Sequence, residues 1–80
     1  MLNVTFLTAN QVIFEGEASK VILPGEQGVF EIGLFHKTLV SRLLPGLATV
    51  DSTEFWIRHG LAKVKNNRVI VMVEIENEAK

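Results

Sequence analysis

The sequence contains no cysteine and no long hydrophobic run. Without cysteine there are no disulfide bonds, no thiolate metal ligands and no cysteine nucleophile, so packing must hold the fold together. No apolar stretch reaches the roughly 18 residues that a membrane span needs, and the first residues lack the basic start and apolar core of a signal peptide. These absences predict a soluble protein of the cytoplasm.

An excess of positive charge is missing as well, because eight Lys and Arg residues stand against nine Asp and Glu residues. A protein that binds the phosphate backbone of nucleic acids normally carries clustered basic residues, so nucleic acid is disfavoured as a partner. With 80 residues, 48% of them hydrophobic and 21% charged, the chain predicts one folded domain over residues 1–80.

Apolar residues alternate with a period of two, for example in segments 4–8 and 18–23, and this pattern predicts β-strands. Segment 34–44 could also form one short helical face, but we favour a strand there. Turn-forming residues recur every several positions, which indicates an all-β sandwich or barrel. The expected breaks between strands lie at Asn10-Gln11, Glu15-Gly16-Glu17, Pro24-Gly25, Pro45-Gly46, Asp51-Ser52-Thr53 and Asn66-Asn67.

The last third of the chain predicts a hairpin. Asn66-Asn67 lies between two apolar runs, and asparagine tolerates the positive φ angles of a tight turn. The following segment 69–73 is apolar at every position, which is typical of a central strand that is covered on both faces.

Candidate catalytic residues are few. His36 and His59 are the only histidines, and acid-base chemistry would need one of them beside a carboxylate such as Glu31, Asp51 or Glu54. No spacing enforces such a pair, and no serine stands in a nucleophile-elbow motif. The dispersed acidic residues also disfavour a metal site. The sequence therefore predicts no active site and no metal site.

The segment around Gly25 and Gly28 offers one indication of a contact surface. A phosphate cradle would need a following helix and usually a lysine, which this strand-rich context lacks, so the glycines are interpreted as turn residues. The aromatic residues of segment 30–56 have too few basic neighbours for single-stranded nucleic acid. The apolar pair Val29-Phe30, between glycine-bearing turns, indicates a protein contact.

Several short motifs follow one another in a fixed order. They are Thr8–Gly16 (TANQVIFEG), Val21–Gly28 (VILPGEQG), His36 followed by Leu39, Leu44-Pro45-Gly46, Gly60, and Val69–Glu74 (VIVMVE). In order and spacing this series resembles the N-terminal β-sandwich of the epsilon subunit of F-type ATP synthase. Each motif alone is unspecific, but together they cover nearly the whole chain.

The resemblance implies a flattened sandwich of two antiparallel sheets with roughly five strands each. It implies a non-catalytic central-stalk subunit, without cofactor, that couples the gamma subunit to the c ring during proton- or sodium-driven ATP synthesis. Such a subunit is peripheral on the cytoplasmic face of the bacterial inner membrane, as part of F1, and meets the membrane only through the c ring. The implied c-ring contacts are Glu26, Gln27, Gly28, Val29, Phe30 and Glu31, and the implied gamma contacts are Thr8, His36, Ser41 and Arg58.

The chain departs from the family pattern at a few positions. The family usually has an acidic residue at Val29 and a glycine at Glu31, and it commonly has Pro-Gly at Leu34-Phe35. The family's C-terminal helical hairpin, which inhibits ATP hydrolysis, has no counterpart in these 80 residues, so a short form or a truncated form is expected.

Two other hypotheses stay open at this point. The small size and the aromatic residues would also suit a free-standing β-sandwich or barrel that binds a ligand or an oligonucleotide. An enzyme built on His36 or His59 comes third.

Overall fold

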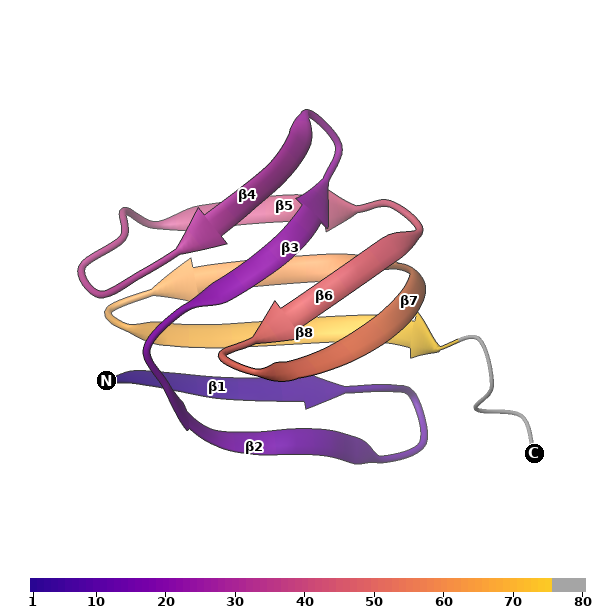
Figure 1. Cartoon of the computed structure of the whole chain (residues 1–80), viewed down its shortest axis with the longest axis horizontal. Helices are drawn as coiled ribbons and strands as arrows, with labels where there is room; N and C mark the ends of the chain where they lie inside the picture. Colours follow the sequence, from indigo (N-terminus) through magenta and orange to yellow (C-terminus); the bar gives the residue numbers. More distant parts are fainter. Residues whose placement is uncertain (76–80) are drawn as a thin grey trace.

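Eight β-strands make up the part of the chain that the computed structural model describes, residues 1–75 (Figure 1). Among these residues, no helix is long and apolar enough to span a bilayer. The strands are β1 (Leu2–Leu7), β2 (Val12–Ala18), β3 (Val21–Gly25), β4 (Gly28–Ile32), β5 (Leu39–Leu43), β6 (Gly46–Val50), β7 (Thr53–Lys65) and β8 (Arg68–Ile75).

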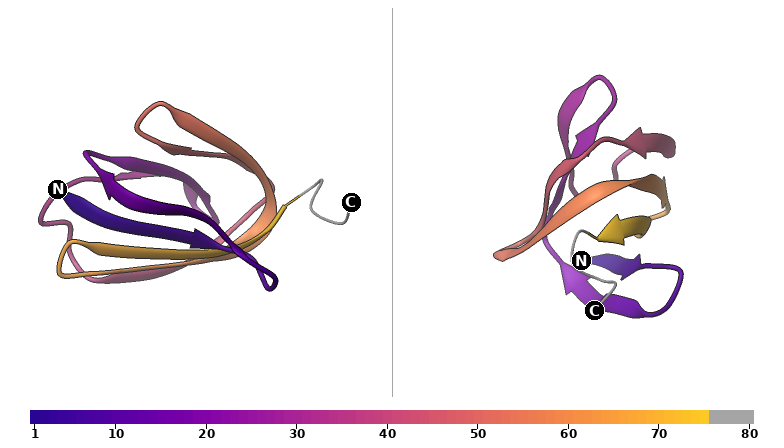
Figure 2. Two further views of the ribbon diagram at one scale, coloured as in Figure 1. Left: turned by 90° about the horizontal axis from the view of Figure 1, so that it is seen from below. Right: turned by 90° about the vertical axis from the view of Figure 1, so that its right-hand side faces the viewer.

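The strands form two layers that share β7. One layer has five strands in the order β2-β1-β8-β7-β5, and the other has β4, β3 and β6 followed by the first half of β7. Strands β3, β4 and β6 cross diagonally over the larger layer (Figures 1 and 2). Residues 53–57 of β7 pair with β6, whereas residues 60–64 pair with β5. One bent strand therefore joins the layers covalently.

Alternating burial along the strands creates the core between the layers. In β1 the side chains of Leu2, Val4 and Phe6 are buried, and in β8 those of Val69, Val71 and Val73 are buried. The Phe6 ring stacks on the ring of Phe55 in β7, with a centroid distance of 5.2 Å. Burial of these apolar side chains is the main source of stability for a chain without disulfide bonds.

The structure confirms the all-β sandwich, the strand at residues 39–43 and the hairpin before β8. Asn66 and Asn67 have φ angles of 54° and 62°, the left-handed conformation that asparagine tolerates better than most residues. Strand β8 lies between β1 and β7, as its apolar sequence predicts. Its outer face, however, is partly exposed in the chain alone.

Three expectations need correction. Strand β1 pairs with β8 in parallel, so the sandwich is not antiparallel throughout. Gly16 continues strand β2 opposite Val4 and is not a break, and a Cβ atom there would meet the Phe14 ring at an ordinary contact distance of 3.8 Å. Pro24 and Gly25 belong to β3, and the turn follows at residues 26–27. Proline is tolerated there, since its carbonyl accepts a hydrogen bond from the Leu44 N–H at 2.8 Å and this bond needs no donor from proline.

Candidate partner-binding surfaces

The hairpin of β3 and β4 projects from the sandwich and carries the residues for which a c-ring contact is implied (Figure 1). Glu26 and Gln27 form its turn, and Gly28 has a φ angle of 120°, which strongly favours glycine. Val29 is 73% exposed. Phe30 is half-buried and packs against the core, so it supports the hairpin from inside. The turn, which we call the hairpin tip (residues 26–29), is therefore accessible.

A groove runs between this hairpin and strand β5. It has a volume of about 690 Å³, and its lining includes residues 25–30 together with His36 and Ser41. The structure thus brings two of the implied gamma contacts next to the implied c-ring contacts. The His36 Nδ1 atom lies 2.8 Å from the carbonyl oxygen of Lys37, and the Ser41 hydroxyl donates to the Arg42 carbonyl at 3.0 Å.

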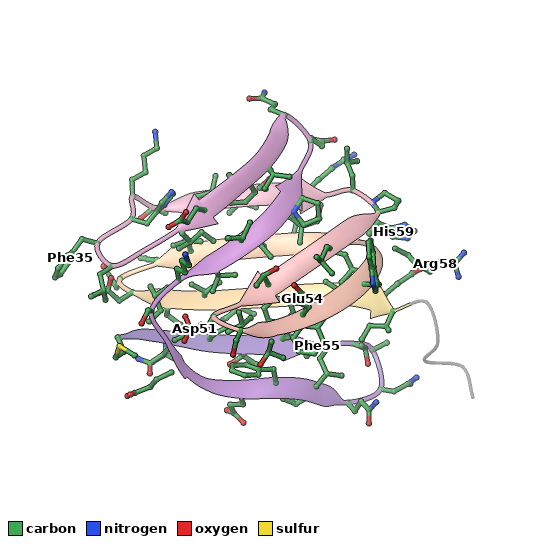
Figure 3. The ribbon with its side chains drawn as sticks, in the orientation of Figure 1. Phe35, Asp51, Glu54, Phe55, Arg58 and His59 are labelled. Atoms are coloured by element: carbon green, nitrogen blue, oxygen red, sulfur yellow. The ribbon has the colours of Figure 1, made fainter. Side chains whose placement is uncertain are left out.

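The other two implied gamma contacts lie elsewhere. Figure 3 shows Arg58 and His59 at one end of the molecule and Phe35, the neighbour of His36, at the opposite end. Arg58 is exposed. Thr8 is 4% exposed, and its hydroxyl oxygen accepts hydrogen bonds from the backbone N–H groups of Asn10 and Gln11 at 3.1 and 3.2 Å. Thr8 therefore shapes the β1–β2 turn rather than offering a side chain to a partner.

Strand register reveals a surface that the sequence motifs did not indicate. On the outer face of the five-stranded layer, residues in register form one row across all five strands. The row consists of Val12, Leu7, Met72 and Leu61, which we call the apolar row, and it ends at Arg42 in β5. Val12 and Met72 are each 53% exposed, Leu61 is 47% exposed and Leu7 is half-buried. An exposed apolar strip of this kind marks an interaction surface.

The face is hollowed at one end of the apolar row. The hollow has a volume of about 610 Å³ and is lined mainly by apolar groups, among them Leu44, Leu61 and Met72. Charged side chains stand at its rim, where His59 Nε2 lies 3.1 Å from Glu74 Oε1. An apolar centre with a polar rim is the usual composition of a protein–protein interface.

The bend of β7 gives this face its shape. A β-bulge lies between Ile57 and His59, and Gly60 follows it opposite Val73. A side chain at Gly60 would collide with the backbone carbonyl of Met72, so no other residue fits without movement of a strand. Strand register and the close approach of two backbones bring the residues of this face together. Among them, only Gly60 was indicated by the sequence, as a residue of the family motif.

The described residues hold little that could serve chemistry. No group of three His, Asp or Glu side chains is arranged for a metal ion within residues 1–75. The buried side-chain nitrogen and oxygen atoms of this part of the chain all have hydrogen-bond partners. The two histidines lie in different parts of the surface, one in the groove and one at the rim of the hollow.

Comparison with known protein families identifies the family of this chain. Residues 1–78 match the family model described as the β-sandwich domain of the ATP synthase delta/epsilon chain. The chain belongs to this family. Family membership agrees with the resemblance drawn from the motifs, and members of the family are accessory subunits of ATP synthase.

Named relatives support the assignment. The chain is 36% identical over 78 residues to the ATP synthase epsilon chain of Sulfurimonas denitrificans, covering 91% of this chain and 60% of the relative. It is 38% identical over 77 residues to the chloroplastic epsilon chain of Trieres chinensis, covering 91% of this chain and 58% of the relative. The chain thus spans somewhat less than two thirds of the length of these epsilon chains.

Solved structures share the fold at lower identity. A chain of the central stalk and c ring of the Tetrahymena thermophila mitochondrial ATP synthase superposes with a TM-score of 0.78 at 14% identity, covering 99% of this chain and 73% of that one. A chain of the Euglena gracilis mitochondrial enzyme superposes with a TM-score of 0.83 at 19% identity, covering 90% and 49%. At these identities the similarity shows the sandwich fold of the family.

Proposed function

We propose that this chain is a non-catalytic subunit in the central stalk of a rotary ATP synthase, where it couples the gamma subunit to the c ring. Family membership carries the proposal, because the chain matches the family's β-sandwich domain over residues 1–78. The solved structures with this fold come from a central stalk with its c ring and from an F1 complex with its c ring. Family membership disfavours the alternative of a free-standing module for a ligand or an oligonucleotide.

The hairpin tip is the proposed contact with the c ring. It stands clear of the sandwich, and it combines the exposed apolar side chain of Val29 with polar neighbours from Glu26 to Glu31. This composition suits the polar loops of a membrane-embedded ring, because a few apolar anchors can be buried inside a polar rim. Contact at the ring would hold the domain at the cytoplasmic face of the membrane.

The outer face of the five-stranded layer is the proposed contact with gamma. The apolar row and the hollow beside it offer several partly exposed apolar side chains on one continuous face. Arg58 lies next to His59 at the rim of this hollow, and Ser41 precedes Arg42 in β5. Two of the four implied gamma contacts, Arg58 and Ser41, therefore border the face, while its centre is made by Met72 and Leu61.

The proposal includes the absence of an active site. His59 pairs with Glu74 on an exposed strand surface, and His36 contacts a backbone carbonyl, so neither histidine is aligned with a nucleophile.

A rotor part must transmit torque without deforming, and a close-packed sandwich has the low compressibility that this role needs.

Binding to the gamma subunit of the same organism tests the proposal. The chain and gamma are co-expressed, and gamma is purified through a tag. We expect the chain to co-purify, and we expect Met72→Asp to lose binding, because a buried carboxylate would remain unpaired in the interface. The matched control is Trp56→Asp, a change at an exposed residue of the other layer, which should bind normally.

Two results would overturn the proposal. One is a folded chain that never co-purifies with gamma. The other is equal loss of binding in the Met72→Asp and Trp56→Asp variants, since the apolar row would then have no special role. Circular dichroism of each variant verifies the fold.

A further inference from the structure

One end of the sandwich combines an exposed aromatic residue with a rigid loop. Phe35 is 85% exposed, and Figure 3 shows that it points away from the molecule. Its φ angle is 63°, which is unfavourable for a bulky residue. The Asn67 side chain holds this conformation, because its Oδ1 atom accepts a hydrogen bond from the Phe35 N–H at 2.7 Å. The fold therefore holds the backbone of Phe35 and presents its ring to solvent.

The same end gathers four of the eight basic residues of the chain, Lys37, Lys63, Lys65 and Arg68. They line two hollows of about 340 and 430 Å³ that share Asn66. Lys65 lies directly opposite Arg68 across the hairpin. Lys63, Lys65 and Arg68 lie within six positions of the sequence, and the fold brings Lys37 to them, although the net charge of the chain is only −1. We call Leu34, Phe35 and these four residues the basic end.

Within residues 1–75, the positive charges of the basic end have no counter-charges beside them. Among the described residues, no carboxylate lies within 4 Å of any of the four basic groups. The nearest acidic residue in register is Glu17, two strands away from Arg68 through Asn3. Like charges directly opposite each other on a hairpin are unfavourable. An external anion would remove this cost.

We propose that the basic end binds the surface of a membrane that contains anionic phospholipids. Basic residues next to exposed aromatic and aliphatic side chains form the usual footprint of a protein on such a surface. The cations would lie near lipid phosphates, while Phe35 and Leu34, which is 45% exposed, would enter the interfacial layer. This contact would be direct, in addition to any attachment through the c ring, and it does not depend on the proposed function.

Two features favour a lipid surface over a free phosphate ion. A specific phosphate site needs donors that converge on one point, often backbone N–H groups. Here the N–H groups of Phe35 and His36 are already bonded to Asn67 Oδ1 and to the Gly33 carbonyl. A free phosphate would also leave the Phe35 ring in water. A bilayer surface satisfies both the spread charges and the apolar side chains.

Flotation with lipid vesicles tests the proposal on the 80-residue chain. We expect binding to vesicles of phosphatidylcholine with phosphatidylglycerol, weak binding to phosphatidylcholine alone, and weaker binding at high salt. The double variant Lys65→Gln, Arg68→Gln should bind about 25-fold more weakly, since each basic residue near an anionic surface contributes about fivefold. Phe35→Asn should bind about tenfold more weakly, and asparagine keeps the positive φ angle.

Matched controls change similar side chains elsewhere. Arg58→Gln removes an exposed cation at the opposite end of the molecule (Figure 3), Trp56→Thr removes an exposed aromatic ring, and neither should alter flotation. Equal binding to both kinds of vesicle, or unchanged binding of the double variant, would overturn the proposal. Loss of flotation in inorganic phosphate at constant ionic strength would also overturn it in favour of a phosphate site. A third result would assign the basic end to a protein partner instead. In it, the chain does not float with vesicles but binds purified gamma, and the double variant does not bind gamma.

Discussion

The bend of β7 and the hairpin tip both depend on a glycine, but the two glycines are constrained by different atoms. At Gly60 an added Cβ atom would meet the backbone carbonyl of Met72. At Gly25, which begins the turn of the β3–β4 hairpin, it would lie 2.7 Å from the Phe30 ring. Backbone atoms of a central strand cannot shift unless the strand moves, whereas a half-buried ring can change its rotamer.

Because the two glycines are constrained by different atoms, we expect the outer face of the five-stranded layer to be rigid and the hairpin tip to be adaptable. The bend of β7 fixes the outer face of the five-stranded layer through contacts between backbones, so that face should keep its shape with or without a partner. The hairpin tip is held by the Phe30 ring and by backbone pairing within the hairpin and to residues 43–44, and its turn makes no side-chain hydrogen bond to the rest of the described chain. We therefore expect the tip to adjust to a partner. Four substitutions test this comparison.

Gly60→Ala should have the largest effect, a loss of about 3 kcal/mol or more in the free energy of unfolding, because strands β7 and β8 must separate locally. Urea unfolding measures it. Gly33→Ala is the matched control, since a Cβ atom there meets nothing within 4 Å, and it should change stability by less than about 0.5 kcal/mol. Similar stabilities for both variants would contradict a rigid bend.

Phe30→Ala should cost about 2 kcal/mol, less than a fully buried phenylalanine, because the ring is half-buried against the core. Thermal and urea unfolding measure the change. A neutral Phe30→Ala variant would mean that the hairpin does not need this ring. Val29→Ala, at an exposed position of the same strand, serves as the control.

Gly25→Ala should cost about 1 to 2 kcal/mol, because the Phe30 ring must shift to admit a methyl group. A smaller side chain at position 30 should relieve this strain. In the double variant with Phe30→Leu, the cost should therefore be lower than the sum of the two single costs, as a double-mutant cycle shows. Strict additivity would mean that the strain at Gly25 comes from the backbone, as it does at Gly60.

Val29→Asp should have the smallest effect on stability, within about 0.5 kcal/mol, because the side chain is exposed. Under the proposed function it should nevertheless weaken attachment to the c ring. The fraction of F1 that stays bound to the c ring in purified complexes measures this. Unimpaired attachment would remove the hairpin tip from the proposed contact.

Local features of the structure were predictable from the sequence. Asparagine at positions 66 and 67 specified the hairpin turn, and alternation of apolar residues specified the buried faces of β1 and β8. Val29 is exposed, as a contact residue would be, but the contact itself stays a prediction. These features depend on the backbone preferences of single residues or on short periodic patterns, which are present in the sequence itself.

The remaining features depend on register between distant strands. The apolar row exists because Leu7, Met72 and Leu61 come into line from three strands. The basic end likewise needs residue 37 to lie near residues 63–68. No local pattern encodes such pairings. The positive φ angle of Phe35 was unpredictable for another reason, because an asparagine from a different hairpin stabilises it against its own preference.

The parallel pairing of β1 with β8 has a consequence for synthesis of the chain. Strand β1 is made first and can pair with β2 at once, but its other edge is completed only by residues 68–72. Until the ribosome has released almost the whole described chain, this edge of β1 offers unpaired N–H and C=O groups to any other strand. Closing so long a loop is also slow. The nascent domain therefore passes through a period in which aggregation competes with folding, and this period ends when β8 inserts between β1 and β7.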